Sequence, residues 1–258
     1  MSDLHWKSAV TKVEPNKLSV RGYKLDELMG EVSYAQMVYL LFKGEMPSKN
    51  VGKMIETILV SSVDHGTTPP SVLSALTVAS TGAPLNASVA AGILSISKFH
   101  GGAIEDCMHI LKQGMEIVKA ENKSLQEAAV QIITEYRSIK KRLSGFGHRV
   151  HTNDPRTVKL FKIAEELGVA GEYVKLAQAF VTALKETTGK DLPLNVDGAI
   201  AALLCEMDFD PILANAFFMI ARVPGLVSHI YEEKTRQKPM RKIHPTDVEY
   251  DGPEGKSL

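Results

Sequence analysis

The chain has 258 residues, of which 44% are hydrophobic and 23% charged, as is usual for one large globular domain or two small ones. Its 30 basic and 30 acidic side chains give a net charge of zero, so no global field favours nucleic acid or an anionic membrane. The first ten residues lack the basic-then-apolar order of a signal peptide, and no apolar run approaches the roughly 20 residues of a membrane span. We therefore expect a soluble cytoplasmic protein in which a local cluster of side chains captures any anionic substrate.

The pattern along the chain predicts an all-α protein with a short β-hairpin at its start. Residues 9–20 alternate weakly around a Glu-Pro-Asn turn, which indicates the hairpin. After Gly22, apolar side chains recur every three or four residues, most clearly over 125–139. Glycine and proline predict breaks between ten to twelve helices at 44–47, 67–70, 82–84, 168 and 189–193.

Several kinds of site are disfavoured by the motifs. Cys107 and Cys205 lie in separate apolar helical patterns, so we expect two buried, reduced thiols rather than a disulfide. His148 and His151 are close together, but without a Cys-x-x-Cys or His-Glu-x-x-His motif a metal site is the weaker interpretation. Phosphate-binding loops, dinucleotide fingerprints and Gly-x-Ser-x-Gly elbows do not occur.

The most informative segment is residues 145–150, Gly-Phe-Gly-His-Arg-Val, followed by Asp154-Pro155-Arg156. The glycines allow a tight turn that brings the His148 imidazole close to a ligand. Asp154 and Pro155 are typical of the N-cap and first residue of a helix. Arg156 would project from that helix start, where amide groups and the helix dipole favour an anion. This combination predicts a site for an acidic small molecule.

Three histidines stand beside glycine in loops that precede helices: His65, His100 and His148. Side chains in such loops can point into a cleft between helices, whereas any single histidine can equally be a surface or core group. We assign structural roles to His5, His109, His151 and His229.

Two charged residues in apolar surroundings complete the candidate site. Asp197 follows a proline turn and opens an apolar helix, so it is either a functional carboxylate or an N-cap. Arg222 interrupts an apolar stretch that starts at Phe217, and its desolvation requires a bound anion or an acidic partner.

Together these motifs resemble the citrate synthase superfamily, through residues 145–156 and also through 100–103, 195–197 and 222–225. The resemblance implies a citrate synthase-like helical fold of two domains. It gives the catalytic positions to His100, His148 and Asp197. It gives the dicarboxylate-binding positions to His65, Arg156 and Arg222.

The chemistry of that family also needs coenzyme A, as a substrate and not as a tightly bound cofactor, and it needs no metal. Removing a methyl proton beside a thioester requires a base, for which the resemblance suggests Asp197. Donors are needed for the enolate and ketone oxygens, here His100 and His148. Four basic residues near the motif are candidates for binding the phosphates of coenzyme A: Arg149, Lys140, Lys141 and Arg142. A basic run at a helix end can, however, also be a solvated cap.

The sequence differs from a typical citrate synthase in three ways that indicate the compact relatives of the family, citryl-CoA lyase and the lyase module of ATP-citrate lyase. The chain is short, with a reduced large domain. Residues 64–70 read Asp-His-Gly-Thr-Thr-Pro-Pro in place of Asp-His-Glu-x-Asn-Ala-Ser. His244 takes the place of an arginine that in synthases reaches the neighbouring subunit's site, and Arg241 is the nearest substitute. We therefore favour citryl-CoA lyase over citrate or 2-methylcitrate synthase, with a non-catalytic coenzyme A- or citrate-binding subunit as a third hypothesis.

The expected large domain comprises residues 1–104 and 221–258, and the small, coenzyme A-binding domain comprises 105–220. A homodimer is expected because the amphipathic helices of the first hundred residues carry more apolar surface than so short a chain can cover. A citryl-CoA synthetase is a candidate partner protein.

Overall fold

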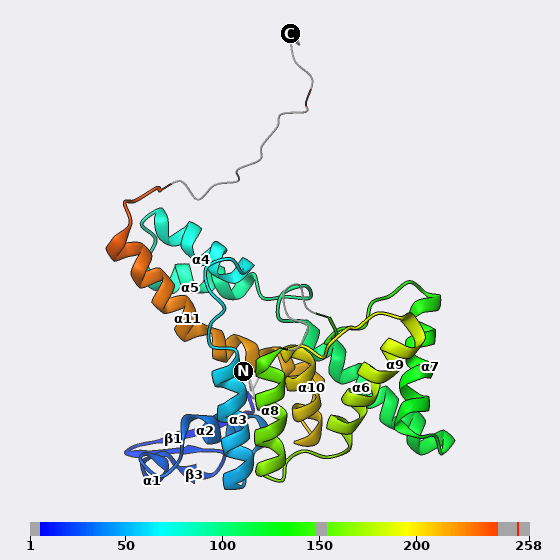
Figure 1. The fold of residues 1–258 in the computed structure, drawn as a ribbon. Coiled ribbons are helices and arrows are strands. Elements are labelled where there is room, and N and C mark those ends of the chain that lie inside the picture. The colour runs from blue at the N-terminus through cyan, green and yellow to red at the C-terminus, as the bar shows by residue number, and fades with distance from the viewer. Residues whose placement is uncertain (1–5, 148–153, 242–251, 253–258) are drawn as a thin grey trace, which may run out of the picture.

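In the computed structural model, which describes residues 6–147, 154–241 and 252, the chain is mostly helical (Figure 1). The all-α prediction is confirmed, and the predicted breaks fall between helices, except that Pro70 already begins one. In chain order the elements are β1 (Thr11–Glu14), β2 (Lys17–Val20), β3 (Tyr23–Lys24), α1 (Leu25–Leu28), α2 (Tyr34–Lys43), α3 (Lys49–Ser61), α4 (Pro70–Ser80), α5 (Leu85–Leu94), α6 (Ala103–Glu121), α7 (Leu125–Ser138), α8 (Pro155–Glu166), α9 (Glu172–Thr188), α10 (Val196–Glu206), the 3-10 helix η1 (Pro211–Leu213) and α11 (Ala214–Arg236).

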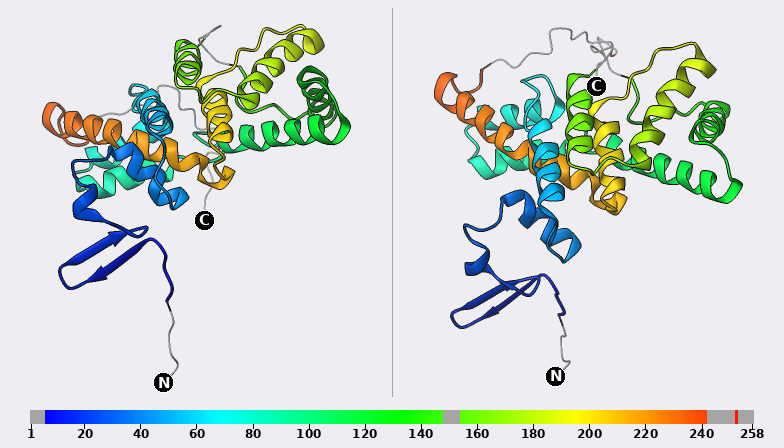
Figure 2. Two further views of the ribbon diagram at one scale, coloured as in Figure 1. Left: turned by 90° about the horizontal axis from the view of Figure 1, so that it is seen from below. Right: turned by 60° about the horizontal axis from the view of Figure 1, so that its bottom comes forward.

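The predicted hairpin is present and extends away from the helices (Figure 2). Strands β1 and β2 pair antiparallel with Thr11 opposite Val20, and β3 adds a short third strand beside β2. Asn16 forms the turn with φ of 60°, a left-handed conformation that asparagine tolerates. Most hairpin side chains are exposed, so the sheet contributes little to the core.

Helix α11 joins the two halves of the molecule (Figure 1). Toward its C-terminal end it packs on α4 and α5, where Leu226 and Ile230 meet Val72 and Leu76 in a small apolar cluster. Toward its N-terminal end it contacts α3 and α6, and Phe217 joins the main core.

The segment Pro211–Arg236 is long and apolar enough to cross a membrane by length and composition alone. Its buried residues include Arg222 and Glu233, and it packs against four other helices. These contacts are those of a core helix in a globular protein.

The other half of the molecule is built around α10. Every residue from 198 to 205 on this helix is buried, and α10 packs against α6, α8 and α9. Helix α7 covers α6 and α9 from the outside. The central position of α10 explains why residues 199–204 are apolar throughout and show no stripe.

Candidate functional site

The loop that carries His100 is a tight turn between α5 and α6. Ser97 and His100 exchange backbone hydrogen bonds of 2.9 Å, and the Gly102 amide donates to the Ser97 carbonyl. Gly101 has φ of +89°, and a Cβ there would lie 2.9 Å from Cδ1 of Phe218. The turn therefore requires glycine after the histidine, which holds the imidazole against α4 and α11.

The His100 ring is held on two sides. Its Nε2 atom lies 2.8 Å from the hydroxyl of Ser71, a fully buried residue in the first turn of α4. Its face meets the Phe218 ring edge-on, with centroids 5.6 Å apart. Burial, together with the positive charge of Arg222, lowers the pKa of His100, so the imidazole is neutral at neutral pH.

Arg222 is buried, and only part of the hydrogen-bonding capacity of its guanidinium is used. Its Nε donates to the Ser62 carbonyl at 3.1 Å, and its guanidinium lies over the Phe218 ring at 4.7 Å from the centroid. Its Nη1 atom is buried and has no hydrogen-bond partner in the part of the chain that the structure describes. A buried, unpaired N–H of a cation is costly, and a bound carboxylate would offset that cost.

Arg156 and Asp154 form the predicted helix start. Asp154 is the N-cap of α8 and accepts from the Arg156 amide at 3.0 Å, and Pro155 is the first residue of the helix. The Arg156 side chain also pairs with the buried Asp154 carboxylate through Nε at 3.1 Å and Nη2 at 2.8 Å. The Arg156 side chain remains 26% exposed, so part of its guanidinium can still contact a ligand.

Asp197 is the second residue of α10, and its N-cap interpretation is wrong because Asn195 caps the helix by accepting from Gly198. Burial raises the pKa of Asp197, opposed by the positive charges of Arg156 and Arg222. A buried carboxyl group with a raised pKa holds its proton more readily than an exposed one, which suits a group that exchanges protons with a substrate.

The loop before His148 is docked onto the segment that leads into α10. The Gly147 amide donates to Pro193 at 2.7 Å, and the Asn195 side chain donates to the Gly147 carbonyl at 2.9 Å. Gly145 has φ of +90°, and a Cβ there would lie 2.9 Å from the Gly198 Cα. Two glycines thus allow the loop and the helix that carries Asp197 to touch through their backbones.

Electrostatic coupling links the described candidates. Arg222 influences the pKa of both His100 and Asp197, and Arg156 influences the pKa of Asp197 and of Arg222. These side chains come from the turn before α6 and from α8, α10 and α11, and Arg222 lies within electrostatic range of the candidates on the other three.

The remaining predicted residues either fall outside the described residues or lie in other loops. His148, Arg149 and His244 fall outside the described residues, as does His151. Lys140, Lys141 and Arg142 are exposed on the loop after α7, where the Lys141 ammonium lies over the Tyr136 ring. His65 is exposed in the loop between α3 and α4. Both cysteines are buried and free, as predicted.

Arg241, the predicted substitute for a C-terminal arginine, is engaged within its own chain. Its Nε lies 2.6 and 2.9 Å from the two carboxylate oxygens of Glu233, which is 5% exposed. This pair satisfies a buried carboxylate and fixes the chain just after α11.

Sequence reasoning missed the residues that support the candidate side chains. Ser71 and Phe218 hold His100, while His229, assigned a structural role, pairs with Asp64 beside His65. No local pattern marks Ser71, because a serine in the first turn of a helix is ordinary. No local pattern marks Phe218, because a phenylalanine in an apolar helix is ordinary core.

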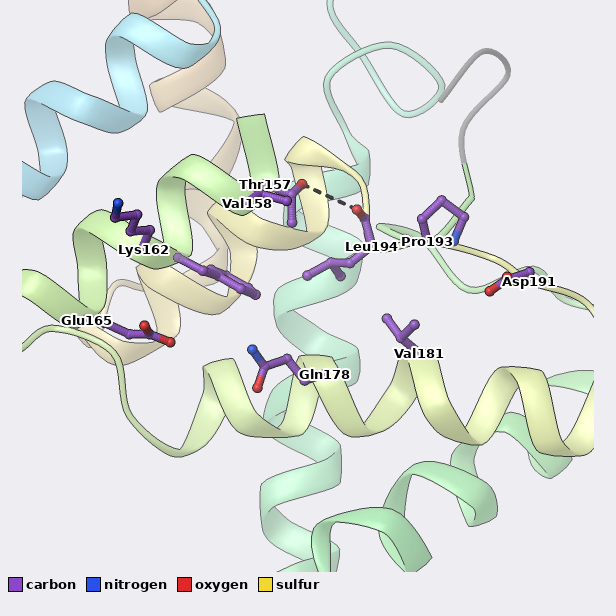
Figure 3. A pocket seen from close by; sticks show the side chains of 10 residues that line it. Thr157, Val158, Lys162, Glu165, Gln178, Val181, Asp191, Pro193 and Leu194 are labelled. Carbon is purple, nitrogen blue, oxygen red and sulfur yellow. Dashed lines mark hydrogen bonds between the residues drawn. The ribbon is translucent and has the colours of Figure 1, made fainter. Parts of the chain in front are cut away.

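A cavity of about 530 Å³ lies between α8, α9 and the segment 191–194 (Figure 3). Its wall includes Thr157, whose hydroxyl donates to the Leu194 carbonyl at 3.3 Å, and the side chains of Lys162 and Gln178. None of the described candidate catalytic residues lines it. Groups of three or more metal-ligating side chains do not occur in the described ranges.

Comparison with known proteins gives consistent matches. The family model for the citrate synthase C-terminal domain matches residues 47–246. Citryl-CoA lyase from Hydrogenobacter thermophilus is similar with a TM-score of 0.89 and 43% identity, over 98% of this chain and 97% of that chain. ATP citrate lyase from Methanothrix soehngenii, in complex with citrate and coenzyme A, shares the fold with a TM-score of 0.84 and 22% identity, over 98% of this chain and 42% of that one.

Among curated proteins, ATP-citrate synthase beta chain protein 2 of Arabidopsis thaliana is 28% identical over 233 residues, which cover 82% of this chain and 36% of the relative. The chain thus spans about a third of the length of the first such relatives. The family model covers most of the chain, and the lyase structure aligns over nearly all of it. The chain therefore belongs to the citrate synthase family.

Proposed function

We propose that this chain is a citryl-CoA lyase, which cleaves citryl-CoA into acetyl-CoA and oxaloacetate. The main support is the 43% identity with a citryl-CoA lyase, which extends over 98% of this chain and 97% of that one.

The proposed reaction assigns one task to each candidate side chain. His148 accepts the proton of the tertiary hydroxyl, the carbon–carbon bond breaks, and its electron pair forms the enolate of acetyl-CoA as the ketone of oxaloacetate appears. His100, neutral and held by Ser71, donates a hydrogen bond to the enolate oxygen. Asp197 then delivers a proton to the methylene carbon, and its raised pKa favours the protonated state that this step needs.

The dicarboxylate portion is assigned to His65, Arg156 and Arg222. The support is the buried Nη1 of Arg222, which has no hydrogen-bond partner among the described residues, because a carboxylate oxygen there would satisfy a desolvated N–H. For coenzyme A we propose Arg149 and the exposed basic residues on the loop after α7, namely Lys140, Lys141 and Arg142.

Citrate or 2-methylcitrate synthase is the alternative, since one site can catalyse both directions of carbon–carbon bond chemistry. Two assays on the same preparation separate them: acetyl-CoA formation from citryl-CoA, and thiol release from oxaloacetate plus acetyl-CoA. We expect acetyl-CoA formation to dominate. Free coenzyme A released at a comparable rate would reject the lyase assignment, and no turnover in either assay would favour a non-catalytic binding subunit.

We further propose that a large part (residues 1–104 and 221–258) and a small part (105–220) close over the ligands, which keeps the enol from water. We propose that the protein is a cytoplasmic homodimer and that a citryl-CoA synthetase supplies its substrate. The exposed apolar side chains Leu73, Leu85 and Leu94 on α4 and α5 support self-association. A monomer in light scattering at micromolar concentration would reject the dimer.

A further inference from the structure

The loop between α3 and α4 lies directly on α11. Arg222 donates from Nε to the Ser62 carbonyl at 3.1 Å. One turn further along the helix, Gly225 faces the loop, and a Cβ there would lie only 2.4 Å from the Val63 carbonyl oxygen. The helix and the loop backbone are therefore in direct contact, with no room for a side chain between them.

The next turn of α11 provides a side-chain contact to the same loop. The Nε2 atom of His229 lies 2.9 Å from Oδ1 of Asp64. The second carboxylate oxygen of Asp64 accepts from the Gly66 amide at 3.0 Å, so the carboxylate spans the backbone of His65. Gly66 has φ of +75°, which completes a tight turn with His65 at its apex.

This pair differs from an ordinary surface ion pair. The His229 side chain is only 15% exposed, and Asp64 is held at both oxygens. Burial alone would raise the pKa of Asp64, but hydrogen bonds from Gly66 and His229 keep it below its ordinary value. The carboxylate is thus charged at neutral pH and can hold both donors at once.

We propose that His229 is a positioning residue of the dicarboxylate site. Its hydrogen bond to Asp64 ties the turn that carries His65 to α11, the helix that carries Arg222. This inference rests on the proposed function, in which His65 and Arg222 bind the two ends of oxaloacetate or of the citryl group. Residues 222, 225 and 229 of α11 contact residues 62, 63 and 64 of the loop, respectively. The helix therefore sets the distance between His65 and Arg222.

The experiment compares His229→Ala, His229→Gln and the control Ser228→Ala, which removes an exposed hydroxyl bound to the Pro224 carbonyl on the same helix. Titration calorimetry measures affinity for oxaloacetate and, separately, for coenzyme A. We expect His229→Ala to weaken oxaloacetate binding about tenfold, the effect of losing one charge-assisted hydrogen bond. Binding of coenzyme A is expected to stay unchanged, and His229→Gln to recover most of the loss because its amide can also donate to Asp64.

Hydrogen exchange of residues 62–66 without ligand gives a readout that does not depend on binding. We expect faster exchange in His229→Ala and normal exchange in Ser228→Ala and His229→Gln. Asp64→Ala, at a side chain that is 38% exposed, should reproduce the loss and should not add to it in the double variant.

Unchanged exchange and unchanged oxaloacetate affinity in His229→Ala would overturn the positioning role alone. Equal loss of oxaloacetate and coenzyme A affinity would also overturn it, since that result indicates general damage to the fold. Failure of the unmodified chain to bind oxaloacetate would instead refute the proposed function together with the inference that rests on it.

Discussion

The imidazole of His100 and the hydroxyl of Ser71 lie 2.8 Å apart, which joins the turn before α6 to the first turn of α4. Ser71 is fully buried, so no water competes for this hydrogen bond. The bond fixes one ring nitrogen of His100, and in the proposed reaction the other donates to the enolate oxygen. Serine is therefore needed at this helix position for its hydroxyl, since helix propensity would favour alanine.

Replacing Ser71 by Ala should lower turnover of citryl-CoA about tenfold or less, because one hydrogen bond that orients His100 is lost. The KM should change little, as Ser71 does not belong to the proposed binding groups. Steady-state formation of acetyl-CoA measures both. Ser74→Ala is the matched control, since Ser74 also bonds a serine, Ser95, one turn further along the same helix. Equal effects of the two variants would contradict the role of Ser71.

The overall fold was predictable because its signals are local. Periodic apolar residues and glycine–proline breaks gave the helices, and Asp154 with Pro155 gave the start of α8. For Asp197 the sequence left the N-cap alternative open because two good capping residues, Asn195 and Asp197, stand close together. Only the geometry of the turn decides which of them accepts from the helix amides.

The supporting residues could not be predicted for a different reason. Ser71 and His100 are 29 positions apart, and Asp64 and His229 are 165 apart, so their pairing depends on tertiary packing alone. The ion pair between Arg241 and Glu233 has the same origin, because the buried carboxylate on α11 pairs with an arginine eight residues away and not with the nearer Arg236. The residue type indicates a candidate side chain, whereas its hydrogen-bond or ion-pair partner can be identified only from the folded structure.

Asp197→Asn should remove activity and raise stability at the same time. Turnover should fall by about two orders of magnitude or more, as is usual when an acid–base group is lost. The folded state raises the pKa of Asp197 above the unfolded value of about 3.9, so its charge destabilises the fold at neutral pH. That destabilisation is complete above the raised pKa and disappears as the pH falls through it.

The thermal midpoint of Asp197→Asn should therefore exceed that of the unmodified chain at pH 7, and the difference should shrink in acid. Asp191→Asn, at a side chain that is 78% exposed, is the control and should change neither turnover nor midpoint markedly. A lower midpoint for Asp197→Asn at pH 7 would show that the carboxylate stabilises the fold after all.

Arg222→Met should abolish the stabilisation that oxaloacetate confers. A ligand at a hundred times its Kd adds about 2.7 kcal/mol to the stability of the state that binds it. Without the guanidinium this gain should vanish, while the ligand-free chain should lose about 1 kcal/mol, the net contribution of the hydrogen bond from Nε to the Ser62 carbonyl. Thermal unfolding with and without oxaloacetate measures both effects. The control Arg236→Met removes an exposed arginine of the same helix, and a retained ligand effect in Arg222→Met would exclude Arg222 from the site.

Gly198→Ala tests the backbone contact between α10 and the loop before His148. Inside a helix, alanine is favoured over glycine by roughly 1 kcal/mol, so propensity alone predicts a more stable chain. At Gly198, however, a Cβ would lie 2.5 Å from the Gly145 carbonyl oxygen, which belongs to a docked backbone and cannot rotate away. We expect a net loss of stability of about 1–3 kcal/mol, as for overpacked cores, and a clear drop in turnover as the loop is displaced.

Gly114→Ala is the matched control, because there the nearest atom is a terminal methyl of Leu176 that can move. Denaturant unfolding of the two variants decides the matter, and similar midpoints would show that the loop yields to the added methyl group.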